Sequence, residues 1–214
     1  MQEHGHGGFV PDLAAWDAWR PEEVARRLAG VEVPWCVAGG WAIDLFLGGQ
    51  RREHGDLEIA VPADRFDPVA MALPDLDFFV VGDGLAWDLA AHPAMRTRQF
   101  QTWGRDREAR RWRLDVMREP HAGDVWIARR DPRIRMPYTE LILRTADGIP
   151  YVRPEVALLF KAKADLAKNE DDFAAALPHL SAASRAWLRE AIALVHPGHR
   201  WLAVLGVDSG ADVS

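Results

Sequence analysis

Val37-Ala38-Gly39-Gly40-Trp41-Ala42-Ile43-Asp44, followed twelve positions later by Asp56-Leu57-Glu58-Ile59-Ala60-Val61, forms the part of the chain that decides the fold. The first segment begins in a short apolar strand (34–38), turns at two glycines and continues as an apolar helix over 41–47. The second segment alternates with a period of two, so its apolar residues face one side of a strand and its acids face the other. This order predicts an α/β fold in which a glycine turn lies near two carboxylates.

The acids of this region are spaced as ligands of a hard cation. Asp56 and Glu58 lie at i and i+2 of the strand, which places their α-carbons roughly 6–7 Å apart. Carboxylate oxygens at that spacing can converge on Mg²⁺. Asp115 lies on the polar side of another alternating segment, 111–117, and is the best candidate for the third acid that a two-metal site requires. A single Asp in a basic strand is equally well explained as a salt-bridge partner.

Gly39 and Gly40 fit a phosphate-binding turn. Without side chains, their backbone N–H groups can approach a phosphate closely, and the start of the following helix adds a favourable dipole. A glycine pair is also the ordinary way to connect a strand to a helix. The glycine turn therefore indicates a phosphate site only in combination with the acids that follow it.

Taken together, the segment 37–44 with Gly48, Arg52, His54 and Asp56-Leu57-Glu58 resembles the nucleotidyltransferase superfamily, in particular its aminoglycoside 2''-O-adenylyltransferase-like branch. The resemblance extends over roughly residues 31–120. It implies the α/β (α+β) fold of these enzymes, a mixed β-sheet flanked by helices with a helical C-terminal region. It also implies an enzyme that transfers a nucleoside monophosphate, AMP in the first instance, from ATP or another NTP to an acceptor hydroxyl and releases pyrophosphate.

The resemblance also assigns roles to the residues at the motif. Asp56, Glu58 and Asp115 correspond to the ligands of two Mg²⁺ ions, and Asp115 also acts as, or positions, the general base that takes the acceptor proton. Gly39 and Gly40 correspond to the turn that meets the triphosphate. The implied acceptor is a small polar molecule, of which an aminoglycoside is one example, and this links the chain to antibiotic resistance.

Four further residues have two interpretations each. Arg52 and His54 match the basic pair that precedes the acids in the family, where they contact phosphate oxygens or brace the loop. A loop histidine bonded to backbone is an equal alternative for His54. Lys161 corresponds to a basic residue that reaches the triphosphate, and its alternative is an exposed ion pair with Asp165. Asp44 either supports the site residues without contacting the substrate, or caps its helix and pairs with a residue near it.

The chain departs from the family pattern at two positions. Glu58 replaces an Asp of the aminoglycoside enzyme, and Gly55 replaces another acid. A longer carboxylate arm can bind Mg²⁺ but alters the octahedral geometry that this ion demands. A catalytically weakened nucleotide-binding protein is therefore one alternative function.

Composition fits one α/β domain with a helical extension. The 214 residues, 49% of them hydrophobic, divide into an expected α/β domain at 1–152, a helical region at 153–207 and a loose tail at 208–214.

The chain lacks a run of 18 apolar residues and a leader pattern at its start, so we expect a cytoplasmic protein without membrane contact. Cys36, the single cysteine, is expected to be a buried, inert thiol. The sequence leaves the oligomeric state open.

Charge gives weak support for a small acceptor. The formal net charge is −6, from 26 basic and 32 acidic residues, which does not favour a broad nucleic-acid surface. Basic clusters at 105–111 and 129–135 are interrupted by acids and are expected to be solvated. They leave a second alternative open, a toxin-type nucleotidyltransferase that modifies tRNA or protein.

The remaining pattern predicts the other elements and the use of the aromatic residues. Ten tryptophans are expected mainly in the core, with one or two at the cleft. We expect a mixed sheet with the acids at a hydrophilic edge. The expected strands after the motif are 77–81, 97–103, 111–117, 124–128, 139–144 and 149–152, and the expected helices outside it are 11–29 (one or two), 62–73, 154–168, 170–177, 181–195 and 198–205.

Overall fold

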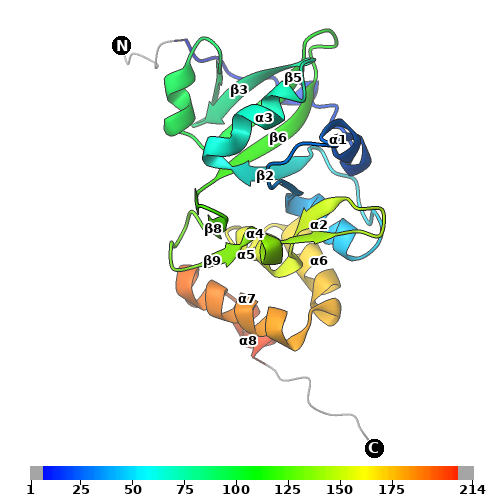
Figure 1. The fold of residues 1–214 in the computed structure, drawn as a ribbon. Helices are drawn as coiled ribbons and strands as arrows, with labels where there is room; N and C mark the ends of the chain where they lie inside the picture. Colours follow the sequence, from blue (N-terminus) through cyan, green and yellow to red (C-terminus); the bar gives the residue numbers. More distant parts are fainter. Residues whose placement is uncertain (1–6, 207–214) are drawn as a thin grey trace, which may run out of the picture.

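The computed structural model describes residues 7–206, and the segments 1–6 and 207–214 lie outside the described residues. The expectations for the start of the chain and for the tail at 208–214 therefore stay predictions. The described chain is a mixed α/β structure, as predicted. In Figure 1 its long strands lie in one half of the molecule, and most of its helices lie in the other.

An eight-stranded mixed sheet organises the fold, with a three-stranded antiparallel sheet beside it. The order in the large sheet is β10-β11-β1-β2-β6-β5-β3-β4, and the small sheet runs β7-β8-β9. The β1–β11 and β2–β6 pairs are parallel, and the other neighbours in both sheets are antiparallel. The strands are β1 (Cys36–Val37), β2 (Glu58–Pro62), β3 (Leu76–Gly82), β4 (Leu85–Asp88), β5 (Gln101–Asp106), β6 (Trp112–Glu119), β7 (His121–Ala122), β8 (Val125–Ile127), β9 (Arg135–Pro137), β10 (Ile142–Arg144) and β11 (Pro150–Val152).

Strand β2 has the alternation that the sequence predicts. Leu57, Ile59 and Val61 are at most 1% exposed and belong to the core. The strand begins at Glu58, so Asp56 lies in the loop before it. The acid-bearing strands β2 and β6 are the two central strands of the sheet, which corrects the expectation that the acids lie at its edge. Their place between flanking strands fixes both backbones.

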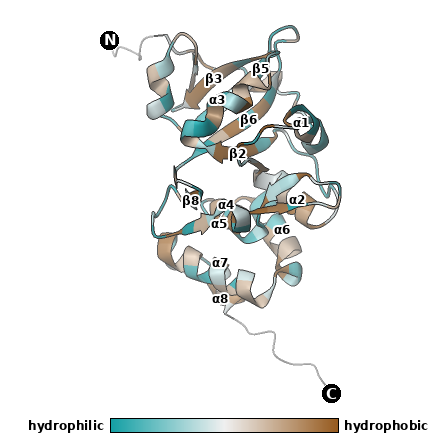
Figure 2. Ribbon diagram, in the orientation of Figure 1, coloured by the Kyte–Doolittle hydropathy of each residue, from teal (hydrophilic) through white to brown (hydrophobic). Residues whose placement is uncertain are grey.

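The helices begin and end near the predicted positions, with 3-10 turns between several of them. Helix α2 packs against α5 and α6, α5 against α7, and α7 against α8. Figure 2 shows hydrophobic residues along β2, β3 and β6, whereas α1 and α3 carry many hydrophilic residues. The helices are α1 (Pro21–Arg27), α2 (Gly39–Phe46), α3 (Phe66–Met71), α4 (Tyr138–Leu141), α5 (Pro154–Lys161), α6 (Ala167–Ala176), α7 (Ala182–Val195) and α8 (Trp201–Leu205), and the 3-10 turns are η1 (Leu13–Ala15), η2 (Ala63–Arg65), η3 (Pro93–Thr97) and η4 (Leu177–His179).

The predicted helix at 154–168 is wrong in its second half. Helix α5 ends at Lys161, and α6 begins at Ala167. The side chain of Asn169, 5% exposed, donates to the carbonyls of Lys161 (3.0 Å) and Ala164 (2.9 Å). These bonds satisfy carbonyls that a continuing helix would have used, and thus stabilise the break.

Two strand predictions are also displaced. Instead of beginning at 97, β5 begins at Gln101, because the buried Arg118 donates to the carbonyls of Arg96 and Gln99 and holds that segment in a turn. The segment 139–144 starts as the helical turn α4 and becomes β10 only at Ile142. Strands β4, β7 and β9 were not predicted, since strands of two to four residues leave almost no periodicity.

The tryptophans behave as expected of core residues. The six in or beside the sheets are at most 9% exposed, and Trp126 also lines the cleft described below. Cys36 is buried, and burial raises the pKa of its thiol to about 12, as expected for an inert cysteine. Within residues 7–206, every helix is too short or too polar to cross a bilayer.

Candidate active site

A cleft of about 490 Å³ opens where the central strands meet the helical half of the chain. Its lining includes the β1–α2 turn, the loop before β2, strands β5 and β6, and helices α5 and α6 with the loop that joins them. The end of β3, Trp126 on β8 and the two arginines after β8, Arg129 and Arg130, also line it. Seven of the eight predicted site residues line this cleft. The eighth, Asp115, lies behind them and is 2% exposed.

The glycine turn is shaped by the side chains that approach it. Gly39 has φ +60°, a conformation that disfavours any residue with a Cβ. A Cβ on Gly39 would lie 1.6 Å from Oε2 of Glu58, and one on Gly40 would lie 2.2 Å from Nη2 of Arg52. Glycine at both positions therefore allows the carboxylate and the guanidinium to reach the start of α2.

Glu58 and Asp115 are direct neighbours across the parallel β2–β6 pair. Gln101 on β5 donates to Oδ2 of Asp115 at 2.5 Å. Oδ1 is buried and has no hydrogen-bond partner among the described residues; the Trp103 indole lies nearby without forming a bond of normal geometry. A buried carboxylate oxygen without a donor is costly, and a cation is one group that would satisfy it.

The pKa values of these acids reflect their crowding. Burial raises the pKa of Asp115 well above its ordinary range, and the charge of Glu58 raises it further. Burial also raises the pKa of Glu58, with a second contribution from Asp56. Three carboxylates thus repel one another across the end of two central strands, which is the arrangement that a bound cation relieves.

The acids do not form a closed coordination shell. In residues 7–206, no three His, Cys, Asp or Glu side chains lie close enough together to hold a metal ion by themselves. Asp56 is exposed at the mouth of the cleft, whereas Asp115 is enclosed behind it. The donor set still fits Mg²⁺, an ion that takes one or two carboxylates and keeps other positions for water and phosphate oxygens.

Arg52 and His54 are held by buried acids on the helices. Arg52 pairs with Asp172 on α6 (Nη2–Oδ2 3.0 Å). The Nε2 of His54 lies 2.7 Å from Oδ2 of Asp44, and its ring stacks on Trp41 at 4.4 Å. Burial lowers the pKa of His54 despite this bond. Asp44 also accepts from the backbone N–H of Arg51. It therefore pairs locally and holds the 51–54 loop from the side away from the cleft.

Comparison with known proteins agrees with this geometry. Residues 22–87, which contain the glycine turn, Arg52, His54 and the first two acids, match the family model described as aminoglycoside-2''-adenylyltransferase. The match places the glycine turn and the first two acids in a segment similar to that family, and it covers about a third of the chain. No curated protein sequence matches it significantly.

Solved structures share the fold of this chain. The solution structure of the antibiotic-resistance factor ANT(2'')-Ia has a TM-score of 0.56 at 16% identity, covering 86% of this chain and 91% of that one. ANT(2'')-Ia in complex with adenylyl-2''-tobramycin gives 0.52 at 17%, covering 79% and 94%. The lincomycin-bound lincosamide antibiotic adenylyltransferase LnuA gives 0.50 at 18%, covering 72% and 92%. At these identities the likeness establishes the fold alone.

Lys161 pairs with an acid that sequence reasoning did not place in the site. Its Nζ lies 2.8 Å from Oδ2 of Asp172, which also binds Arg52. The alternative pair with Asp165 is wrong, because α5 ends at Lys161 and Asp165 instead pairs with Arg200. Asp172 could have been found, since it shares a helical face with Asn169, Phe173 and Ala176 at 3.6-residue spacing.

A second missed residue is Glu119, at the end of β6. It is 4% exposed, lines the cleft and pairs with Arg129 at 2.9 Å. Burial raises its pKa, although the charge of Arg129 and the Trp126 indole oppose the shift. Nothing in the local pattern separates it from a surface acid at a strand end.

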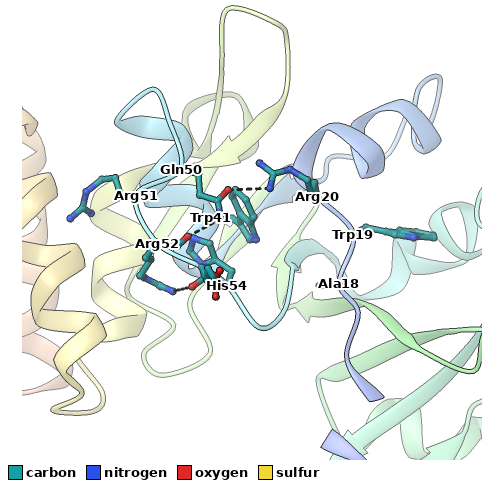
Figure 3. Close-up of a pocket in the computed structure, with 9 residues that line it drawn as sticks. Ala18, Trp19, Arg20, Trp41, Gln50, Arg51, Arg52 and His54 are labelled. Atoms are coloured by element: carbon teal, nitrogen blue, oxygen red, sulfur yellow. Dashed lines mark hydrogen bonds between the residues drawn. The ribbon is translucent and has the colours of Figure 1, made fainter. Parts of the chain in front are cut away.

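A second pocket, of about 570 Å³, lies on the outer side of the 50–54 loop (Figure 3). Trp41 forms part of its wall, and Arg20 lies above this ring at 5.1 Å while donating to Gln50. Glu53 is the one acid in its lining. The crowded carboxylates lie at the cleft and not at this pocket, so the cleft is the candidate active site.

Proposed function

We propose that this protein is a nucleotidyltransferase that moves AMP from ATP to a hydroxyl group of a small polar acceptor, with release of pyrophosphate. The observation that carries the proposal is the crowded pair of Glu58 and Asp115, which lies beside the glycine turn in a cleft that basic residues also line. Aminoglycosides, named in the description of the matching family, are the first acceptors to test.

Each residue of the motif has a role in this proposal. Asp56, Glu58 and Asp115 would hold Mg²⁺, one or two ions, and Asp115 would also receive or direct the acceptor proton. When bound, the cation supplies positive charge to the phosphate oxygens and orients them. Gly39 and Gly40 keep the start of α2 open for the triphosphate.

The basic residues of the cleft supply the rest of the binding. Arg52 and Lys161 are held in place by Asp172 with their charges at the cleft wall. Lys168 is exposed at the same wall. Fixed cations of this kind bind phosphate oxygens and position the triphosphate for in-line attack, which is most of what such an enzyme must do.

The basic clusters expected at the surface give little support to a macromolecular acceptor. Arg107 pairs with Asp77, Arg133 with Asp131 and Arg129 with Glu119. Charges neutralised in this way do not form the continuous basic face that nucleic acid requires. A small acceptor is the simpler interpretation.

The test is release of pyrophosphate from each of the four NTPs with Mg²⁺, against aminoglycosides, other small polyols and bulk tRNA. We expect release that depends on ATP, on one class of small acceptor and on Asp56, and that Asp56→Ala abolishes. Glu53→Ala, which removes an exposed acid from the same loop, is the matched control and should leave the rate unchanged. Nucleotide that stabilises the protein without any release would indicate a binding protein instead.

A further inference from the structure

The charge of the cleft restricts the acceptor. Six of its described lining residues are basic and three are acidic. The basic residues are Arg52, Arg129, Arg130, Lys161, Lys163 and Lys168, and the acidic residues are Asp56, Glu58 and Glu119.

None of the three lining acids is available to an acceptor. Asp56 and Glu58 are committed to the cation in the proposed function. Glu119 is committed to Arg129, with its second oxygen 3.4 Å from the Trp126 indole nitrogen. An amino group entering the cleft would therefore find no free carboxylate.

Free positive charge, in contrast, remains at the cleft. Lys163 is exposed, lines the cleft and has no ion-pair partner in the described part of the chain, and the proposed function does not assign it to the triphosphate. Like charges placed together in an interface cost free energy. A polyamine would have to approach this lysine without compensation, whereas a neutral or anionic molecule would not.

The wall formed by Phe100 and Phe160 is apolar. Phe100 is 46% exposed although it lines the cleft. The guanidinium of Arg129 lies 5.1 Å from the ring of Phe100 and 5.9 Å from that of Phe160. Arg129 thus lies against both rings while Glu119 neutralises its charge, and the exposed part of Phe100 offers an aromatic surface against which an apolar ring can pack.

We infer that the acceptor is a hydroxyl compound that is neutral or anionic and carries an apolar ring, and that it is not a polycation. The inference rests on the proposed function, since it concerns the acceptor of that reaction. It argues against the aminoglycosides named in the description of the matching family as the acceptor of this chain, because they are polycations.

The experiment compares three probes of different charge on the full chain loaded with Mg²⁺ and a non-hydrolysable ATP analogue. The probes are phenyl β-D-glucoside (neutral), phenyl β-D-glucuronide (anionic) and tobramycin (polycationic), titrated calorimetrically at physiological salt. We expect one or both phenyl glycosides to bind more tightly than tobramycin, by about tenfold or more. Tobramycin binding as tight as, or tighter than, both glycosides would overturn the inference, and so would a failure of both glycosides to bind.

Two variants test the residues on which the inference depends. Lys163→Glu, at an exposed position, should strengthen tobramycin binding about tenfold, and Lys163→Gln should do so less. Phe100→Ala should weaken glycoside binding about tenfold and leave tobramycin unchanged. Unchanged affinities in both variants would contradict the assignment.

The same samples separate this inference from the proposed function. Pyrophosphate release with ATP reports on the reaction, and the relative affinities report on the charge class of the acceptor. A chain that never releases pyrophosphate refutes the transferase but leaves the ranking of the three probes intact. A chain that adenylylates tobramycin faster than either glycoside confirms the transferase and overturns the inference.

Discussion

Glu58 and Asp115 on the central strands, and Asp172 on α6, are acids beside the same cleft with opposite surroundings. The first two face each other and Asp56, and burial with mutual repulsion raises their pKa values. Burial also acts to raise the pKa of Asp172, but hydrogen bonds from Arg52 and Lys161 outweigh it and lower the pKa. Asp172 is satisfied within the fold, whereas the pair on the strands is left unsatisfied.

This difference separates a structural acid from a functional one. A protein gains nothing in stability from placing carboxylates together without a counter-charge, so such a group points to function. Asp172 has a structural role, because its charge is neutralised by Arg52 and Lys161 and holds these two side chains in position. The two sites should therefore respond differently to removal of a charge.

The largest effect is expected from Glu58→Gln, which keeps the volume of the side chain and removes its charge. Pyrophosphate release should fall about 10²–10³-fold, because a fixed negative charge is lost at the point where the cation and triphosphate meet. The thermal midpoint should stay equal or rise, since repulsion with Asp115 is relieved. Steady-state kinetics and a melting curve on the same sample measure both, and Glu53→Gln is the control. A variant that is active but unstable would reverse our assignment of the two sites.

The next largest loss of activity is expected where the Glu58 carboxylate approaches Gly39. Gly39→Ala introduces a Cβ at φ +60° that would meet Oε2 of Glu58. Displacement of that carboxylate by about 1 Å should cost on the order of 10²-fold in rate, and the strained backbone should cost about 1–2 kcal/mol.

Gly55→Ala is the matched control for the glycine turn. A Cβ on Gly55 meets nothing within 4 Å, and its φ is not in the left-handed region. Rate and urea midpoint should both stay near wild type. Equal losses in Gly39→Ala and Gly55→Ala would show that the loop as a whole, rather than the approach of Glu58 to Gly39, limits the reaction.

A third effect should appear in stability and in nucleotide binding. Asp172→Asn leaves Arg52 and Lys161 without their shared partner and should destabilise the fold by about 3 kcal/mol. The KM for ATP should rise more than kcat falls, because the two cations lose position while the carboxylates of the strands are untouched. Asp171→Asn, at an exposed neighbour, should change neither parameter. A fall in kcat alone would place Asp172 in the chemistry itself.

The two sites also differ in how much of them the sequence predicts. The period-two pattern from Leu57 to Val61 predicts the core face of β2, and the motif predicts that Asp56 and Glu58 belong with Gly39. That Asp115 lies opposite Glu58 depends on the order of strands, which local periodicity does not contain. The pairing follows only once β2 and β6 are known to be neighbours.

Asp172 could be predicted only as a buried acid. Its helical face, shared with Phe173 and Ala176, indicates burial, but its partners lie 120 and 11 positions away along the chain. The break after Lys161 is equally hidden, because the cap comes from Asn169 inside the next helix. Long-range side-chain contacts of this kind decide the site, and a single sequence does not specify them.

The smallest effect concerns Glu119, which lies between the two extremes with one cation, Arg129, and a raised pKa. Because its folded-state pKa is above the unfolded value of about 4.3, the folded protein holds the proton more tightly than the unfolded chain. The contribution of Glu119 to stability must therefore decline as pH rises from that value through its folded pKa. Glu119→Gln does not titrate, so its urea midpoint should gain on wild type as the pH rises above the unfolded pKa of Glu119.

For Asp172 the sign is opposite, since a lowered pKa makes wild type lose stability as pH falls. Urea titrations of Glu119→Gln and Asp172→Asn at several pH values would show whether the number of cationic partners sets the sign of the pH dependence. Parallel pH profiles of the two variants would contradict the opposite signs predicted here.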